Sequence, residues 1–262
     1  MTRAGMAGAA VSTVLGLLAM SLSGDFATAA QKPALLKLAA GARVGVVNLL
    51  DPEVTHFHAS RQLQNSFLKT SSVGWPVSAM LMQALREGLT QMGLTPVAAA
   101  PTEALARARE ACFLNAALAK GLPKACGPLY GQLAAAEHLE ALIVLGPGLN
   151  DSMHAGGIRR RGLPEYLRGW CIVSEEGVTG VTAGAPALLN LTELLLIGVT
   201  ASGGELSARQ WGGEQTEYWT GFKPPADLKS IADAQLNELQ PLFAAMLRQQ
   251  AVGLLTHLEV AR

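Results

Sequence analysis

Apolar and polar positions divide the chain into segments of strand and helix character. Residues 43–50 form an apolar run, RVGVVNLL, whose poor alternation indicates a strand buried on both faces. From Pro76, apolar residues recur at helical spacing as far as Met92, and Gly93 and Pro96 follow. Proline at the first helical position and glycine just past the last predict a helix between them.

The alternation of strands and helices continues as far as residue 146. A short strand is expected near residues 94–98, and Thr102 is a good N-cap for a helix over 103–119. A further helix is expected over 129–139, and the apolar run 141–145 predicts a third strand. Strands that alternate with helices indicate a sheet with parallel pairs and covering helices.

The carboxyl half has a different pattern. Residues 169–174 and 194–201 have strand character, and a Ser-Gly-Gly turn leads from the second into 205–211, which predicts a β-hairpin. The last element is a helix over 230–258 that Pro241 should kink or split. The expected fold class is therefore α/β. It is a single three-layer-type domain with a mixed sheet, parallel strands first, a carboxyl-half hairpin and a long carboxyl-terminal helix.

The first residues have the pattern of an export signal. Met-Thr-Arg precedes an apolar stretch over about 7–22 and a small-x-small cleavage signal, Ala-Thr-Ala, that ends at residue 29. We expect a signal peptide over 1–29, a linker over 30–42 and a single α/β domain over 43–262. The alternative is an uncleaved anchor, although this short stretch is rich in Ala, Gly and Ser and would span a bilayer poorly. The expected location is the periplasm, or the medium after secretion.

Composition and charge narrow the class of partner. Half of the 262 residues are apolar, and the 20 basic residues balance the 20 acidic ones. A neutral chain lacks the broad positive field that nucleic-acid binding needs, so no nucleic-acid partner is expected. No later apolar run reaches transmembrane length, so no transmembrane segment is expected in the mature chain.

Three cysteines bear on the redox state of the exported chain. Cys112 and Cys126 flank a Gly-Leu-Pro turn, so a disulfide between them is expected in an oxidising compartment, with Cys171 free. The alternative is three small, buried thiols. No CxxC pair is present, which argues against a zinc site built from cysteines.

Two long segments, 51–75 and 146–168, are expected to be loops and carry the main candidate ligands. His56 and His58 stand two residues apart in the first, and Asp151 and His154 lie in the second. If both loops leave the carboxyl edge of one parallel sheet, these side chains would share a cleft. Zinc binding is then possible, although no cofactor is expected; the alternative is that they are solvated loop residues.

Two other groups are candidate contact residues. The basic run Arg159, Arg160 and Arg161 is a candidate anion contact, with a solvated turn as the alternative. Trp211 and Trp219 flank a polar stretch and are candidate partner contacts, whereas Trp170 stands in an apolar strand.

Sequence motifs give little support to catalysis. The chain has no Gly-x-Ser-x-Gly elbow, and residues 146–148 (Gly-Pro-Gly) lack the lysine and spacing of a phosphate loop. Cys171 falls inside an expected strand, where a buried thiol is inert. The interpretation therefore leans away from an enzyme without excluding one.

Three stretches resemble the small α/β domain of bacterial envelope-assembly proteins. They are residues 44–50 with 77–92, residues 135–146 (AAEHLEALIVLG) and residues 199–207 (VTASGGELS). The resemblance is to the amino-terminal domain of TolB and to the curli-secretion lipoprotein, and it covers about residues 43–257. The chain departs from them in its longer segments 51–75 and 146–168 and in lacking the lipid-anchoring cysteine. The resemblance implies a non-enzymatic assembly or binding role.

Two function classes follow from these observations. The first is an exported, non-catalytic protein that binds another envelope protein or helps to assemble an envelope or secretion complex, with a homo-oligomer possible. The second is a metal- or small-ligand-binding protein, or a hydrolase, that uses the histidine-bearing loops.

Overall fold

The computed structural model describes eleven stretches of the chain, all within one compact unit that extends from Ala34 to Arg262. They are residues 35–59, 67–119, 124–146, 149–150, 167–168, 170–175, 187–190, 194–199, 206–211, 216–219 and 231–261. The expected signal peptide therefore lies outside the described residues. Within those residues, none of the helices combines the length and the apolar character needed to cross a membrane.

The first sheet contains the strands that the apolar runs predict. Its order is β12-β11-β6-β2-β5. The central strand β2 pairs in parallel with both β5 and β6, while β6–β11 and β11–β12 are antiparallel. This confirms a mixed sheet with the parallel strands first and a hairpin in the carboxyl half. The strands are β2 (Arg43–Asn48), β5 (Thr95–Ala99), β6 (Ala141–Leu145), β11 (Leu194–Val199) and β12 (Leu206–Trp211).

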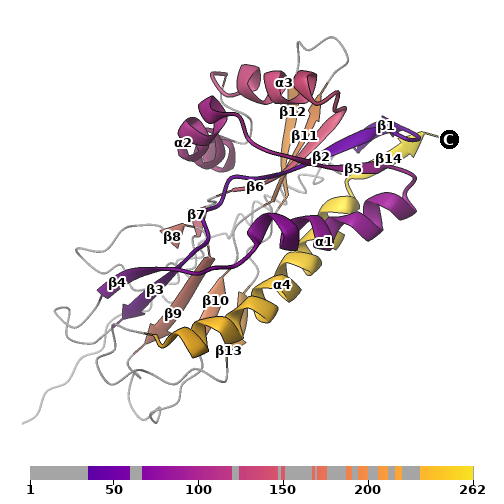
Figure 1. The fold of residues 1–262 in the computed structure, drawn as a ribbon. Coiled ribbons are helices and arrows are strands. Elements are labelled where there is room, and N and C mark those ends of the chain that lie inside the picture. Colours follow the sequence, from indigo (N-terminus) through magenta and orange to yellow (C-terminus); the bar gives the residue numbers. More distant parts are fainter. Residues whose placement is uncertain are drawn as a thin grey trace, which may run out of the picture. The chain divides into compact units, whose positions relative to one another are not determined.

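Helices pack against both faces of this sheet (Figure 1). On β6, Ile143 belongs to one core cluster with residues of α1 (Val77–Gln91) and α4 (Asp233–Leu255). The next residue, Val144, belongs to a second cluster with residues of α2 (Glu103–Ala119) and α3 (Gly127–Ala136). Because neighbouring strand residues point to opposite faces, the clusters lie on the two sides of the sheet. The three-layer arrangement is confirmed.

A second five-stranded sheet, absent from the prediction, has the order β13-β10-β9-β3-β4. The segment 51–75, expected to be a loop, contains the antiparallel hairpin β3–β4, and β3 pairs in parallel with β9. Histidine, threonine and serine made this segment resemble a loop, but in the structure its successive side chains point to opposite faces of a strand. The strands are β3 (Glu53–Ala59), β4 (Phe67–Ser72), β9 (Trp170–Glu175), β10 (Ala187–Asn190) and β13 (Thr216–Trp219).

Part of the second expected loop also forms a short ladder. Within 146–168, β7 (Leu149–Asn150) pairs antiparallel with β8 (Leu167–Arg168).

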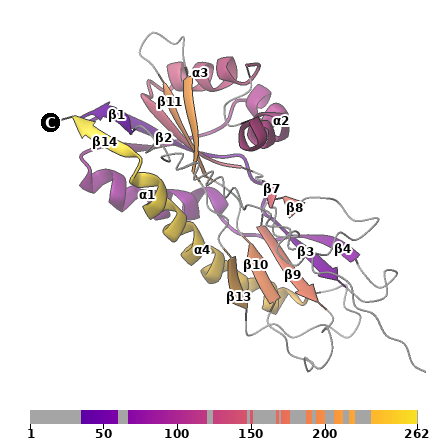
Figure 2. The same ribbon diagram turned by 180° about the vertical axis from the view of Figure 1, so that it is seen from behind.

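One hydrophobic cluster connects the two sheets. Val46 of β2, Ile172 of β9 and Phe243 of α4 all belong to it. The helix α4 is continuous through Pro241, so the proline does not split it, and Pro241 itself is exposed. Figures 1 and 2 show α4 beside α1 in both views, and the single long helix can therefore contribute to the core beneath both sheets.

The segment expected to be a linker contains one strand of a two-stranded parallel sheet. β1 (Leu36–Ala39) pairs with β14 (Leu258–Ala261), the strand that follows α4. Leu38 and Leu258 are both buried in the cluster that connects the sheets. Residues 36–39 are thus part of the folded unit, and periodicity could not reveal this because β1 has only four residues and a distant partner.

Candidate functional site

His56 and His58 lie on β3 and point into the protein. Each side chain is 5% exposed, as is Ser174 on the neighbouring strand β9. The Ser174 Oγ lies 2.7 Å from His56 Nε2 and 2.9 Å from His58 Nδ1. The structure therefore brings both predicted histidines together, but around a serine hydroxyl inside a sheet rather than in an open loop.

Strand register places these three side chains on one face of the second sheet. His56 pairs with Ile172 and His58 with Ser174, so alternate residues of β3 and β9 stand side by side. Phe67 of β4 covers the two rings: its centroid lies 5.1 Å from that of His56, edge-on, and 5.3 Å from that of His58, stacked. The aromatic neighbour and the burial keep water away from the cluster.

The environment of the cluster favours a neutral ring at His56. Burial, followed by the positive charge that His58 would carry, lowers the pKa of His56 from 6.5 to about 4. Ser174 has one hydroxyl hydrogen, so at most one imidazole accepts it, and the other must donate to the serine oxygen. The three groups therefore form a balanced hydrogen-bonded unit while both rings are neutral.

A serine hydroxyl within hydrogen-bond reach of an imidazole is the geometry of an activated nucleophile. Here each of the three side chains is almost completely enclosed. A substrate could reach the hydroxyl only if β3 or its surroundings moved. The arrangement therefore serves the packing of the sheet more directly than it serves catalysis.

Ser174 was not among the residues singled out from the sequence. It ends the expected strand 169–174, and its alternation with Trp170 and Ile172 gives the signal that could have located it on their face.

The remaining predicted ligands cannot be compared with this cluster. Asp151 and His154 lie outside the described residues, as do Arg159, Arg160 and Arg161. Among the side chains that are described, no group of three or more His, Cys, Asp or Glu is placed to hold a metal ion. The shared cleft and zinc site therefore stay predictions.

Of the two tryptophans predicted as partner contacts, Trp219 is buried instead. Trp219 is 4% exposed and belongs to the core, so it is not available as a partner contact, because the apolar face of β13 is buried. The side chain of Trp211 lies outside those described. Trp170 is fully buried, as predicted, and its rings pack 5.3 Å from Trp75 and 5.2 Å from Phe243 between centroids.

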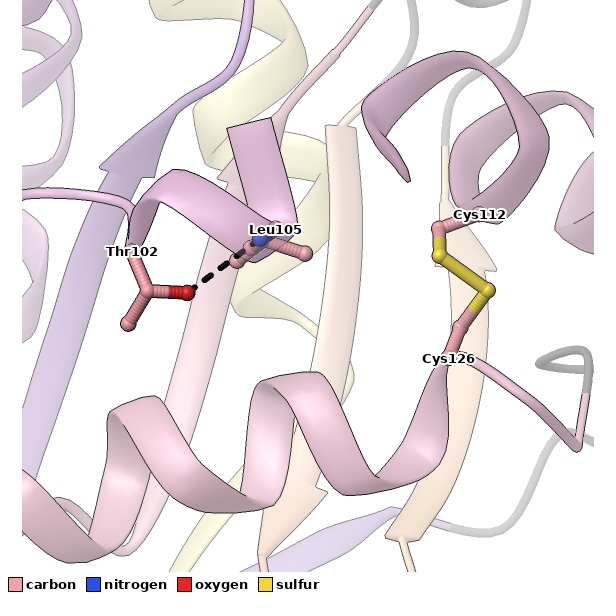
Figure 3. The surroundings of a disulfide bond; sticks show 4 residues. All are labelled: Thr102, Leu105, Cys112 and Cys126. Atoms are coloured by element: carbon pink, nitrogen blue, oxygen red, sulfur yellow. Dashed lines mark hydrogen bonds between the residues drawn. A yellow bond between two sulfur atoms is a disulfide. The ribbon is translucent and has the colours of Figure 1, made fainter. Parts of the chain in front are cut away.

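The structure contains the disulfide that the turn between the cysteines favoured. Cys112 in α2 and Cys126, the N-cap residue of α3, are bonded, with their Cα atoms 5.4 Å apart (Figure 3). Thr102 caps α2 as expected, because its Oγ1 accepts from the backbone N–H of Leu105 at 3.2 Å. Cys171 is buried and takes no part in this disulfide, and burial raises the pKa of its thiol.

An ion pair at the end of β2 was not expected from the sequence. Arg109 of α2 donates from both terminal nitrogens to the two carboxylate oxygens of Asp51, one of these contacts being 2.7 Å long. The hydrogen bond to Asp51 raises the pKa of Arg109. Nearby, the side-chain amide of Asn48 bonds to both backbone groups of Leu50, which fixes the turn out of β2.

A hollow of about 590 Å³ lies along the exposed face of α1. The described residues that line it all belong to this helix, including Gln83, Arg86 and Thr90. Its lining residues are on α1, whereas the shared cleft was expected at the carboxyl edge of the parallel strands. A hollow whose described lining comes from a single helix does not by itself indicate a ligand site.

Comparison of the chain with protein-family models, with curated protein sequences and with solved structures found no match in any of the three.

Proposed function

We propose that this protein is an exported, non-catalytic α/β protein that binds another protein of the cell envelope or helps to assemble an envelope complex. The observation that carries the proposal is the disulfide between Cys112 and Cys126. Disulfides persist in oxidising compartments, and the first 29 residues have the pattern of an export signal. The two observations are independent of each other, and both support a protein that works outside the cytoplasm.

The burial of the most reactive side chains supports binding rather than catalysis. His56, His58 and Ser174 are enclosed within the second sheet, and the thiol of Cys171 is buried in the same sheet. Outside the core, the described surface has two features that a partner protein could contact. The outer face of α1 is hollowed, and Val252 on α4 is 68% exposed. The resemblance to envelope-assembly domains supports the same class of function.

Edge strands of both sheets carry features that discourage pairing with another chain. β5 is an edge of the first sheet and contains Pro96. The backbone N–H of Thr95 donates to the carbonyl of Ala42, just before β2. The nitrogen of Pro96, the next residue, therefore faces away from β2, where an added strand would need an N–H donor that proline lacks. β4 is an edge of the second sheet and carries the exposed Lys69. We therefore expect partners to contact helices and loops rather than to extend a sheet.

Site-specific cross-linking in intact cells tests this proposal. A photoreactive residue is introduced at Gln83 on α1, at Lys69 on β4 or at Val252 on α4, all of which are exposed. We expect a discrete adduct with one envelope protein from α1 or α4 and little from β4. A variant that lacks residues 1–29, the expected signal peptide, gives the background. If the full-length chain gives only the adducts that this variant gives, the proposal of an envelope partner is contradicted.

The second candidate function, metal or small-ligand binding, rests on His56 and His58. Its test is the metal content of purified protein, measured beside a His56→Gln, His58→Asn variant. Stoichiometric zinc in the unmodified protein, lost in the variant, would favour the second candidate. Equal metal content in both proteins would remove these histidines as ligands.

A further inference from the structure

We propose that two copies of this protein associate through α4, with the outer face of this helix pairing antiparallel with the same face of a second copy. The inference goes beyond the proposed function, which concerns a different protein as partner, and does not depend on it. The pairing surface, called the dimer face below, consists of Glu238, Pro241, Leu242, Ala245, Arg248, Gln249 and Val252.

Apolar side chains lie along the outer face of α4, although its inner face already packs in the core. Leu242 is 38% exposed and Val252 is 68% exposed, and these are two of the four exposed large hydrophobic side chains among the described residues. Pro241 is exposed beside them, and Ala245 is partly exposed. Single exposed apolar residues are ordinary, but an apolar stripe on a second face of a helix is typical of a contact with a partner.

The spacing of the dimer face fits a second helix. Glu238, Ala245 and Val252 are spaced by seven residues, and Leu242 and Gln249 have the same spacing. Seven residues are close to two turns of an α-helix, so each set forms a line along the helix and the two lines are neighbours. Ala245 is at the centre of the face, where a short side chain allows two helices to approach closely.

Charge favours a second copy, in antiparallel orientation, as the partner. Glu238 and Arg248 are exposed, and neither takes part in the ion pairs between described residues. A parallel pair of helices would place like charges together. In an antiparallel pair with its axis at Ala245, Glu238 lies within about 6 Å, along the helix, of Arg248 of the second copy. The face is therefore complementary to itself, as a two-fold dimer requires.

The size of the dimer face determines the expected strength of association. From residue 238 to residue 252 the helix extends about 21 Å. A contact made by one such stretch from each copy is smaller than a standard protein interface, so we expect a reversible dimer with a Kd of about 1–100 μM.

Sedimentation velocity tests the association, with protein purified after expression of the full chain and studied from about 1 to about 300 μM. We expect the mass to rise from that of a monomer to that of a dimer. Val252→Asp places a carboxylate opposite Glu238 of the second copy and should lower the association constant at least about 10-fold. Protein that stays monomeric throughout would overturn the proposal, as would a dimer that Val252→Asp leaves unchanged.

Charge reversal tests whether the dimer face pairs with itself. Glu238→Arg alone or Arg248→Glu alone places like charges opposite each other and should weaken the dimer by about 10-fold. Both substitutions in one chain should restore association, and a mixture of the two single variants should form a mixed dimer. Glu140→Arg is the matched control, because Glu140 is exposed and lies outside α4, and this variant should associate as the unmodified protein does. Failure of the double substitution to restore the dimer would overturn the proposal.

Introduced cysteines test the orientation of the two helices. A mixture of Glu238→Cys and Val252→Cys chains should form a disulfide-linked dimer on oxidation, because these positions are opposite each other in the antiparallel pair. Glu238→Cys alone should not, because its two copies are about 21 Å apart, too far for a disulfide. Cross-linking of Glu238→Cys with itself would overturn antiparallel pairing.

The same face also shows which partner occupies it in intact cells. A photoreactive residue at Val252 should be captured by a second copy of the chain. Capture only by a different protein would assign the face to that protein and overturn the dimer, while it would leave the proposed function standing.

Discussion

Gly45 lies in the middle of β2, where two leucines occupy the space that a side chain would need. A Cβ built at this position would stand 2.5 Å from Leu139 Cδ1 and 2.8 Å from Leu142 Cδ2. Both leucines are buried, so they have little room to move. We expect Gly45→Ala to lower the free energy of unfolding by about 1–3 kcal/mol, the usual cost of overpacking a core. Urea denaturation at pH 7.5 measures it.

Gly74→Ala is the matched control for this substitution. A Cβ at Gly74 would meet no atom within 4 Å, and the residue is exposed. Its effect should lie within about 0.5 kcal/mol of zero, or be slightly stabilising because alanine restricts the unfolded chain. Equal stabilities for the two variants would show that Leu139 and Leu142 repack freely around the added methyl group.

Single residues also show where sequence reasoning reached the candidate site and where it stopped. His56 and His58 were recognised by residue type and spacing, but polarity suggested a loop, and the structure places them in a buried strand. A histidine is neutral when its pKa is depressed, so it can enter a core as a polar, hydrogen-bonded ring. Ser174 escaped notice because its role depends on the β3–β9 register, which connects residues far apart in the sequence.

At the scale of secondary-structure elements, the disulfide connects α2 to the start of α3. The two cysteines are 14 residues apart. Closing a loop of this length stabilises a protein by about 3 kcal/mol, mainly by restricting the unfolded chain. We therefore expect reduction to lower the free energy of unfolding by about this amount, as measured by urea denaturation with and without reductant.

A Cys112→Ala, Cys126→Ala variant provides the control for the reductant. It should unfold at the same urea concentration in both conditions, because a chain with one remaining cysteine, Cys171, cannot form an internal disulfide. Unmodified protein that is equally insensitive to reductant would mean that the bond does not contribute to stability.

The elements that were predicted share a local signal. β2, β6 and the stripe of α1 are continuous or periodic apolar runs, and the hairpin β11–β12 has glycines at its turn. In the second sheet, β9 was expected as a strand over 169–174, whereas β4 (FLKTSS) lacks such a signal because it is mostly exposed and polar. Its strands are stabilised by pairing with distant segments, and burial across such pairs is invisible to a short sequence window.

At the scale of the whole folded unit, the pairing of β1 with β14 joins the segment before the first sheet to the segment after α4. The backbone N–H of Leu36 donates to the carbonyl of His257 at 2.8 Å. Leu38 and Leu258 are each 6% exposed, whereas the ion pair of Lys37 with Glu259 lies on the surface. The apolar contacts therefore account for most of the stabilisation. Cleavage after residue 29 would leave this pairing intact.

Two truncated chains that begin at different positions, residue 35 and residue 43, test the contribution of β1. A chain that begins at residue 43 lacks the strand, loses the burial of Leu38 and exposes part of Leu258. Burying one leucine contributes about 1.5–3 kcal/mol, so we expect this chain to be less stable by about 2–4 kcal/mol than one that begins at residue 35. Lys37→Ala in the longer chain should cost less than about 1 kcal/mol, because the ion pair is exposed. Equal stability of the two chains would return residues 36–39 to the role of a linker, and urea denaturation of all three proteins decides between these outcomes.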